Sequence, residues 1–451
     1  MATLQRPAAP IRTVSNSSFA ESFDIARRKL DKELDGNISS PDSRPGSPAS
    51  LATGSTVTPA ELSTPLTPFN AAIDADPDVA DEFAFAFDID GVLIRGGKVI
   101  PEAIEAMKVL NGENEYGVKV PYIFLTNGGG KTEAERCGDL SRQLELEVSP
   151  GQFICGHTPM REMADRYKTV LVVGGEGEKC RHVAEGYGFT DVITPGDILK
   201  ANAAVSPFRK LTDTEHANSK DLLSRGQLSD IVIDAVFVFA DSREWASDLQ
   251  IMLDIAMSKG GRLETRSETF DESPPFYFSH NDTLWAAQHE HPRLGMGALR
   301  SIVETTFESV TGGKKLETHA FGKPQVSTFE FATRLLQKWR AAQHGLESSK
   351  PPETVYFVGD TPESDIRGTN AMNEASDNDW FSILVKTGVY QDGTEPAYKP
   401  RQTVETVLDA VNFGIRREME ARKARSAGPD EKAVIEKLLP LDAAAQPTTT
   451  A

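Results

Sequence analysis

This 451-residue chain has few cysteines and no long apolar run, and its 48 lysines and arginines are outnumbered by 67 acidic residues. The three cysteines, Cys137, Cys155 and Cys180, form no short paired spacing, which argues against a zinc site and fits a reducing compartment. No run of eighteen apolar residues occurs, so we expect no transmembrane segment. The net charge of −19 disfavours nucleic acid and anionic membranes as partners, because both carry charge of the same sign.

The first 80 residues differ from the rest of the chain. They are rich in Ser, Thr, Pro and Ala, and large apolar side chains are rare between residues 39 and 68. Such a segment cannot bury enough apolar surface to offset its ordering entropy, so we predict a disordered tail. Its first twenty residues contain Arg6 and Arg12 and no acid. This pattern predicts a mitochondrial transit peptide. The alternative is a cytoplasmic protein whose Ser-Pro and Thr-Pro pairs make the tail a phosphorylated regulatory segment.

From residue 83 onward, short apolar segments alternate with amphipathic ones. The apolar segments read as strands, at residues 83–87, 123–125, 169–173, 235–239, 354–358 and 381–385. Strands that alternate with helices predict an α/β fold with parallel sheets.

Acidic residues follow two of these predicted strands. Asp88 and Asp90 come directly after the segment 83–87, and Asp360 and Asp365 follow the segment 354–358. Open α/β sheets bind their ligands at the carboxyl ends of strands. Two carboxylates as close as the first pair repel each other unless a cation or a shared proton compensates. A hard cation such as Mg²⁺ prefers carboxylate oxygens of this kind, so the two pairs together predict a metal site.

Two further residues lie at the ends of predicted elements. Thr126 follows the strand 123–125 and begins a glycine-rich segment that could hold a phosphate oxygen. Lys323 stands just before a predicted helix. Alone, each has an ordinary alternative reading, a turn for Thr126 and a solvated surface charge for Lys323.

In this order, the residues resemble the four motifs of the haloacid dehalogenase superfamily of phosphotransferases. Asp88-Ile-Asp90 matches the first motif, Thr126 the second, Lys323 the third, and Asp360 with Asp365 the fourth. About two hundred residues separate the second motif from the third, enough for an inserted domain. An insertion at this point is similar to class IIA of the superfamily, whose α/β cap closes over the active site. Residues 274–285 further resemble the subfamily named after the cat-eye-syndrome critical region, many of whose members are mitochondrial.

The resemblance implies a Rossmann-like core with a parallel sheet and an inserted α/β cap domain. We expect a disordered tail at 1–80, the first part of the core at 81–155, the cap at 156–294 and the second part of the core at 295–415. A charged helix and a flexible tail would follow at 416–451. Because class IIA caps often mediate dimers, a homodimer through the cap is a candidate assembly.

The resemblance also assigns roles. Asp88 would attack phosphorus and Asp90 would act as general acid and base, while Thr126, Asn127 and Lys323 would hold the phosphoryl group. Asp88, Asp90 and the fourth-motif pair Asp360 and Asp365 would hold Mg²⁺. The expected activity is hydrolysis of a small phosphorylated metabolite through an aspartyl-phosphate. The alternative is a catalytically weak binding or scaffold protein of the same fold, linked to mitochondrial or glycerophospholipid metabolism.

Two other patterns carry less weight. The loop at residues 174–177 has part of a dinucleotide-binding fingerprint but lacks its full glycine spacing. The histidines His280, His289 and His291 match no common zinc spacing, so we expect them to be exposed.

Overall fold

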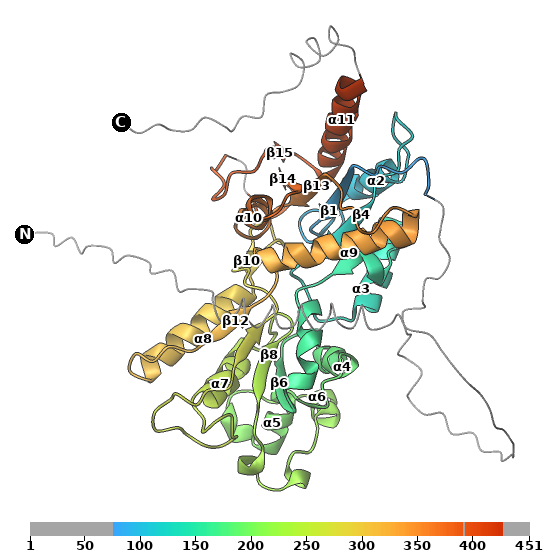
Figure 1. Cartoon of the computed structure of the whole chain (residues 1–451). Helices are drawn as coiled ribbons and strands as arrows, with labels where there is room; N and C mark the ends of the chain where they lie inside the picture. The colour runs from blue at the N-terminus through green and yellow to red at the C-terminus, as the bar shows by residue number, and fades with distance from the viewer. Residues whose placement is uncertain (1–74, 391–392, 427–451) are drawn as a thin grey trace, which may run out of the picture. The chain divides into compact units, whose positions relative to one another are not determined.

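The computed structural model describes residues 75–390 and 393–426 (Figure 1). The predictions for the first 74 residues, including the transit peptide and the phosphorylated tail, lie outside the described residues, as does the predicted tail after residue 426. Within the described ranges, no helix combines the length and the apolar character that a membrane crossing requires.

A six-stranded parallel sheet contains the strands that precede the predicted motifs. Its order is β15-β14-β13-β1-β4-β5, and every pairing is parallel. The bounds are β1 Phe83–Phe87, β4 Tyr122–Leu125, β5 Phe153–Ile154, β13 Thr354–Gly359, β14 Asp379–Val385 and β15 Gln402–Val404.

The alternation of large and small side chains in β1 explains how helices cover this sheet. Successive side chains of a strand point to opposite faces. The phenylalanines of β1 pack with α2 (Pro101–Leu110), α3 (Glu133–Leu144) and α11 (Val407–Ser426). Ala84 and Ala86 face the other side, where α9 (Val326–His344) and α10 (Arg367–Ala375) pack (Figure 1).

A second, five-stranded parallel sheet lies between β5 and β13 in the sequence. Its order is β12-β9-β8-β6-β7. Its strands are β6 Thr169–Val173, β7 Asp191–Ile193, β8 Ala235–Val238, β9 Phe276–Phe278 and β12 Thr318–Ala320. The helices in this region are α4 Lys179–Gly186, α5 Pro195–Ala201, α6 Asp213–Asn218, α7 Trp245–Ala256 and α8 Met296–Val310. The two parallel sheets with their helices confirm the predicted α/β class.

The second sheet extends further along the chain than expected. We placed residues from 295 onward in the core, but α8 packs into the apolar cluster of the second sheet and β12 pairs with β9. The chain therefore returns to the first sheet only after residue 320.

The remaining elements are short. β2 (Ile94–Arg95) pairs with β3 (Lys98–Val99), and β10 (Leu284–Trp285) pairs with β11 (Arg293–Leu294). Single 3₁₀ segments lie at Pro150–Gln152, Thr158–Arg166, Ala203–Val205, Leu223–Arg225 and Leu228–Asp230, and a π-helical turn at Pro362–Ile366 leads into α10.

Candidate active site

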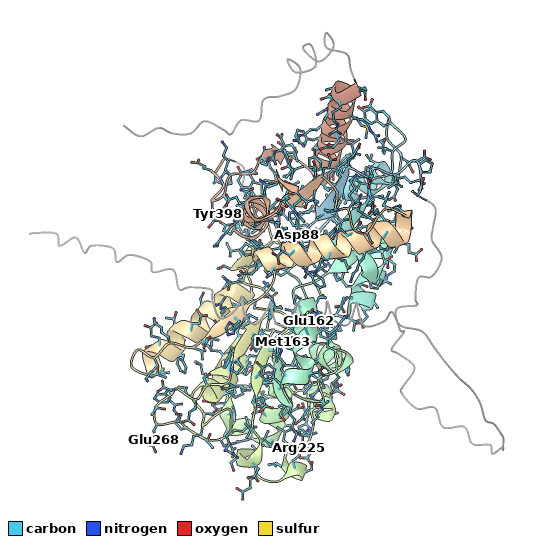
Figure 2. All side chains as sticks on the ribbon, viewed as in Figure 1. Asp88, Glu162, Met163, Arg225, Glu268 and Tyr398 are labelled. Carbon is cyan, nitrogen blue, oxygen red and sulfur yellow. The ribbon has the colours of Figure 1, made fainter. Side chains whose placement is uncertain are left out.

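Three adjacent strands bring the predicted site residues to one edge of the first sheet. Asp88 (labelled in Figure 2) follows β1, Thr126 follows β4, and Asp360 follows β13. Because β13, β1 and β4 are neighbours and parallel, their carboxyl ends lie at the same edge. This is the edge at which open α/β sheets bind ligands.

Three of the predicted metal-binding carboxylates lie together. Asp88, Asp360 and Asp365 are buried, and each offers one oxygen such that all three oxygens lie within 4.8 Å of one another. Burial raises the pKa of Asp88 well above its usual range, and burial together with the Asp365 charge raises that of Asp360 to about 7. An all-oxygen, carboxylate-rich donor set of this kind fits Mg²⁺.

Glycines allow the chain to approach Asp360 closely. A Cβ on Gly91 would lie 2.1 Å from Asp360 Oδ2, and a Cβ on Gly388 would lie 1.8 Å from the same oxygen. Gly91 also adopts a φ of +93°, which side chains rarely tolerate. Asp360 Oδ2 accepts a hydrogen bond from the Val389 backbone N–H at 2.6 Å. The side chain of Asp360 is therefore held in a space that a side chain at position 91 or 388 would occupy.

Lys323 supplies the positive charge among these carboxylates. Its Nζ lies 2.8 Å from Asp88 Oδ1 and 2.7 Å from Asp365 Oδ1, and the side chain is 1% exposed. Burial disfavours the charged ammonium, but the Asp365 and Asp88 carboxylates outweigh burial and raise the pKa of Lys323. One ammonium among three carboxylates leaves negative charge at the site, which a divalent cation would offset.

Asp365 also fixes the loop that follows β13. Its Oδ2 accepts hydrogen bonds from the backbone N–H groups of Asp360 and Thr361, both at 3.0 Å. Gly359 passes close to this side chain, because a Cβ there would lie 2.3 Å from Asp365 Cβ. Asp365 thus orients both the Asp360 loop and the Lys323 ammonium.

Asn127, which we expected to hold the phosphoryl group, has its side chain engaged by the segment that contains Lys323. Its Oδ1 accepts a hydrogen bond from the Lys323 backbone N–H at 2.8 Å. Its Nδ2 donates to the Lys323 carbonyl at 3.0 Å and to Asp282 Oδ2 at 2.9 Å. An amide group has only two N–H donors, and both are engaged. The side chain instead holds the loop that contains Lys323. This loop can approach Asn127 closely because residue 322 is a glycine, and a Cβ there would lie only 2.5 Å from Asn127 Oδ1.

Asp90 and Thr126 lie beside a pocket of about 130 Å³. Asp90 is partly buried and belongs to no group of clustered carboxylates in the described part of the chain. Burial raises its pKa, while the charges of Arg136 and Lys323 oppose this increase. Thr126 Oγ1 accepts a hydrogen bond from the Gly128 backbone N–H at 3.0 Å, which fixes the start of the glycine-rich loop.

The second sheet contributes polar residues that the sequence did not assign to the site. Asp282 contacts Asn127, and His280 Nδ1 lies 3.6 Å from Asp282 Oδ2. His280 Nε2 lies 3.9 Å from Asp241 Oδ2. The prediction that all three histidines are exposed was wrong for His280, which is buried, whereas His289 and His291 are exposed. His280 could have been distinguished by its place two residues after the end of β9, because ligand sites of α/β sheets lie near the carboxyl ends of strands.

A second cluster of metal-binding residue types lies elsewhere in the described region. Glu133, Cys155 and His157 offer ligand atoms within 4.8 Å of one another. Hydrogen bonds already engage these groups, because His157 Nδ1 lies 2.7 Å from the Tyr187 hydroxyl, which donates to Glu133 Oε1 at 2.6 Å. Burial also raises the pKa of the Cys155 thiol to about 12, so a thiolate ligand is disfavoured. We read this cluster as a hydrogen-bonded part of the core.

Comparisons with known proteins match both halves of the site. A family model for haloacid dehalogenase-like hydrolases matches residues 85–190, and a second, HAD-hydrolase-like model matches residues 320–410. The first range contains Asp88, Asp90 and Thr126, and the second contains Lys323 and Asp360.

Two curated relatives match over most of this chain. A mitochondrial hydrolase of Saccharomyces cerevisiae is 39% identical over 349 residues, which cover 73% of this chain and 94% of the relative. A cardiolipin synthase (CMP-forming)/mitochondrial hydrolase fusion protein of Schizosaccharomyces pombe is 37% identical over 346 residues, or 76% of this chain. The chain spans about half the length of this fusion protein, 54%. Among solved structures, a p-nitrophenyl phosphatase from Archaeoglobus fulgidus is similar with a TM-score of 0.46 at 18% identity, covering 74% of this chain and 100% of that one.

Proposed function

We propose that this chain, which belongs to the haloacid dehalogenase-like hydrolases, is a Mg²⁺-dependent phosphatase that acts on a small phosphorylated metabolite. The observation that carries the proposal is the buried Lys323 ammonium, which contacts both Asp88 and Asp365 at one end of the parallel sheet. A buried ion pair at the carboxyl ends of strands is costly for stability alone and is typical of a site that handles charged groups.

Asp88 is the proposed nucleophile. Lys323 stabilises its ionised form, as the 2.8 Å contact indicates, and an ionised carboxylate can attack phosphorus. A bond forms between an Asp88 oxygen and phosphorus while the bond from phosphorus to the ester oxygen breaks. Asp90, whose pKa is raised by burial, donates its proton to the departing oxygen. The carboxylate of Asp90 then takes a proton from a water molecule as its oxygen bonds to phosphorus. The bond between phosphorus and the Asp88 oxygen breaks, which releases inorganic phosphate and returns Asp88 to its carboxylate form.

The metal would be held by the carboxylates of Asp88 and Asp360 and by the backbone carbonyl of Asp90, with Asp365 as a ligand or as an orienting group. When bound, Mg²⁺ would offset the negative charge of the phosphoryl oxygens beside these carboxylates. The buried oxygen cluster of Asp88, Asp360 and Asp365 supports this assignment.

The phosphoryl oxygens would be held by the Thr126 hydroxyl, by backbone N–H groups of the glycine-rich loop and by Lys323. We assign Asn127 a positioning role instead, since its amide group is engaged by the Lys323 backbone. Removing Asn127 should therefore displace Lys323 rather than delete a direct phosphate contact.

The second sheet would form the class IIA cap, and Asp282, which contacts Asn127, would belong to the part of the cap that meets the core. A cap over the site favours small substrates, because a folded protein surface could not enter. Both curated relatives are named as mitochondrial hydrolases, which supports a mitochondrial location. The proposal also places the chain in the cat-eye-syndrome-critical-region-like subfamily and includes a homodimer through the cap.

Release of inorganic phosphate from an aryl phosphate and from a panel of metabolite esters tests the proposal. Wild-type protein with Mg²⁺ should turn over several esters, and both a chelator and Asp88→Asn should abolish turnover. A folded protein that binds Mg²⁺ but hydrolyses no ester would instead favour the alternative, a binding or scaffold protein of the same fold.

A further inference from the structure

The pocket beside Asp90 extends from the proposed catalytic acid to a basic residue. Asp90 and Thr126 line one part of it, and Gly128, Gly129 and Arg136 line further parts. Its volume of about 130 Å³ can hold several water molecules and therefore a small polar group. The mechanism described above uses Asp90, Thr126 and the glycine-rich loop from this lining, but it assigns no role to Arg136.

The lack of a side chain at Gly128 keeps the pocket open beside Asp90, and the neighbouring Gly129 has no room for a side chain. A Cβ on Gly128 would lie 3.3 Å from Asp90 Oδ2 and 3.4 Å from Thr126 Oγ1. A longer side chain at this position would extend into the space beside Asp90. A Cβ on Gly129 would lie 2.6 Å from His157 Cδ2, so this position also excludes a side chain. The loop therefore leaves room directly beside the acid.

Arg136 on α3 provides a cation in this pocket, and its charge acts on Asp90 without a direct ion pair. Its side chain is partly buried, and no hydrogen bond or ion pair to it is formed by residues 75–390 or 393–426. The other basic side chain of the pocket, Lys131, contacts Asp139 at 2.5 Å, and Arg142 on the same helix pairs with Asp139 as well. The partly buried Arg136 guanidinium therefore keeps its hydrogen-bond donors free of the side chains described around it, although its charge acts on Asp90.

Resting on the proposed function, we infer that this pocket receives the leaving group of the substrate and that Arg136 binds a second anionic group on it. Asp90 must touch the ester oxygen that it protonates, so the leaving group begins at Asp90. The pocket opens at the same side chain and contains the guanidinium. A guanidinium binds carboxylate or phosphate oxygens through two parallel hydrogen bonds. The substrate class is thus a phosphate monoester of a short alcohol that also carries a carboxylate or a second phosphate.

Three esters of equal chain length test this inference with the full-length protein and Mg²⁺. Propyl phosphate has an uncharged tail, carboxyethyl phosphate ends in a carboxylate, and propanediol bisphosphate ends in a second phosphate. Wild-type protein should have a higher kcat/KM for one or both anionic esters than for propyl phosphate. Which anionic ester is preferred distinguishes the two chemical sources of the second charge.

The variant Arg136→Gln should lower the ratio of kcat/KM for the preferred anionic ester to that for propyl phosphate by roughly ten- to hundredfold. This is the range expected for a lost charge-assisted hydrogen bond. Arg142→Gln is the matched control, because Arg142 lies on the same helix, is 73% exposed and pairs with Asp139. It should leave the ratio unchanged, and urea unfolding of both variants verifies the fold.

The outcomes separate this inference from the function on which it rests. Hydrolysis of all three esters with the same ratio in wild type and in Arg136→Gln would overturn the role of Arg136 while leaving the phosphatase intact. A wild-type preference for propyl phosphate would overturn the substrate class. If no ester is hydrolysed, an aryl phosphate included, the proposed function fails and this inference fails with it.

Discussion

Replacing Lys323 with methionine should destabilise the fold far more than replacing an exposed lysine. Lys323 is 1% exposed, and its ammonium contacts Asp88 and Asp365 at 2.8 and 2.7 Å. Methionine fills a similar volume without the charge, so packing is largely kept while two buried carboxylates lose their partner. The nearby Asp360 adds a third negative charge.

The size of this loss follows from the burial of the pair. Removing one partner of a buried ion pair typically costs about 3–5 kcal/mol, because the remaining charge is left uncompensated in a poorly solvated site. We therefore expect the free energy of unfolding of Lys323→Met to fall by about this amount at neutral pH in the presence of a chelator. Added Mg²⁺ should recover part of the loss, because the cation would offset the same carboxylates and binds the folded state selectively.

Urea denaturation with and without Mg²⁺ measures both effects. Lys314→Met is the matched control, because Lys314 Nζ lies 2.7 Å from Asp271 Oδ1 but the two side chains are 46% and 59% exposed. Exposed pairs of this kind contribute less than about 1 kcal/mol. Equal losses for the two variants, or no effect of Mg²⁺ on the unfolding of wild type and Lys323→Met, would refute the reasoning.

Three further predictions concern single side chains. Asn127→Ala removes the hydrogen bonds to the Lys323 backbone, so it should lower the free energy of unfolding by roughly 2–4 kcal/mol, as measured by urea unfolding. In steady-state kinetics, the decrease in kcat should be larger than the increase in KM. A change in KM alone would indicate that Asn127 contacts the phosphate directly. Burial raises the pKa of Asp248 to about 6, so the folded state binds its proton more tightly than the unfolded state and wild-type stability falls as pH rises through this window. Asp248→Asn should therefore add roughly 2–3 kcal/mol of stability above pH 6 and little near pH 4, whereas the same gain at both pH values would contradict this cause. Gly388→Ala places a Cβ 1.8 Å from Asp360 Oδ2 and should displace this carboxylate. The Mg²⁺ concentration that gives half-maximal activity should then rise by about tenfold or more. An unchanged dependence of activity on Mg²⁺ would argue against Asp360 as a ligand.

The sequence predicted those parts of the site that lie directly after strands. Asp88, Thr126 and Asp360 each follow an apolar segment, and parallel strands bring such positions to one edge of a sheet. Lys323 could be placed only through the resemblance, because no local pattern distinguishes it from a surface lysine. The structure brings its Nζ into contact with Asp88.

Contacts between distant segments could not be read from the sequence. Asn127 and Lys323 are separated by 196 residues, so nothing near Asn127 indicates that its amide group binds the Lys323 backbone. The assignment of α8 and β12 to the core failed for a related reason, since strand order in a sheet depends on pairing between segments and β12 joins the sheet beside β9. Arg136 gave no signal in the sequence, because its distinguishing feature is the lack of an ion-pair partner in the described residues around it.

The most direct test of the proposed mechanism is to trap the phosphoryl group on Asp88. With p-nitrophenyl phosphate, whose leaving group needs no proton, Asp90→Asn should still transfer phosphate to Asp88 but should hydrolyse the aspartyl-phosphate slowly. Acid quenching followed by mass spectrometry should then find about one phosphoryl group per chain, on the peptide that contains Asp88, and none in the Asp88→Asn/Asp90→Asn double variant. Turnover by Asp90→Asn without a covalent phosphoryl group, or a phosphoryl group on another residue, would contradict the account.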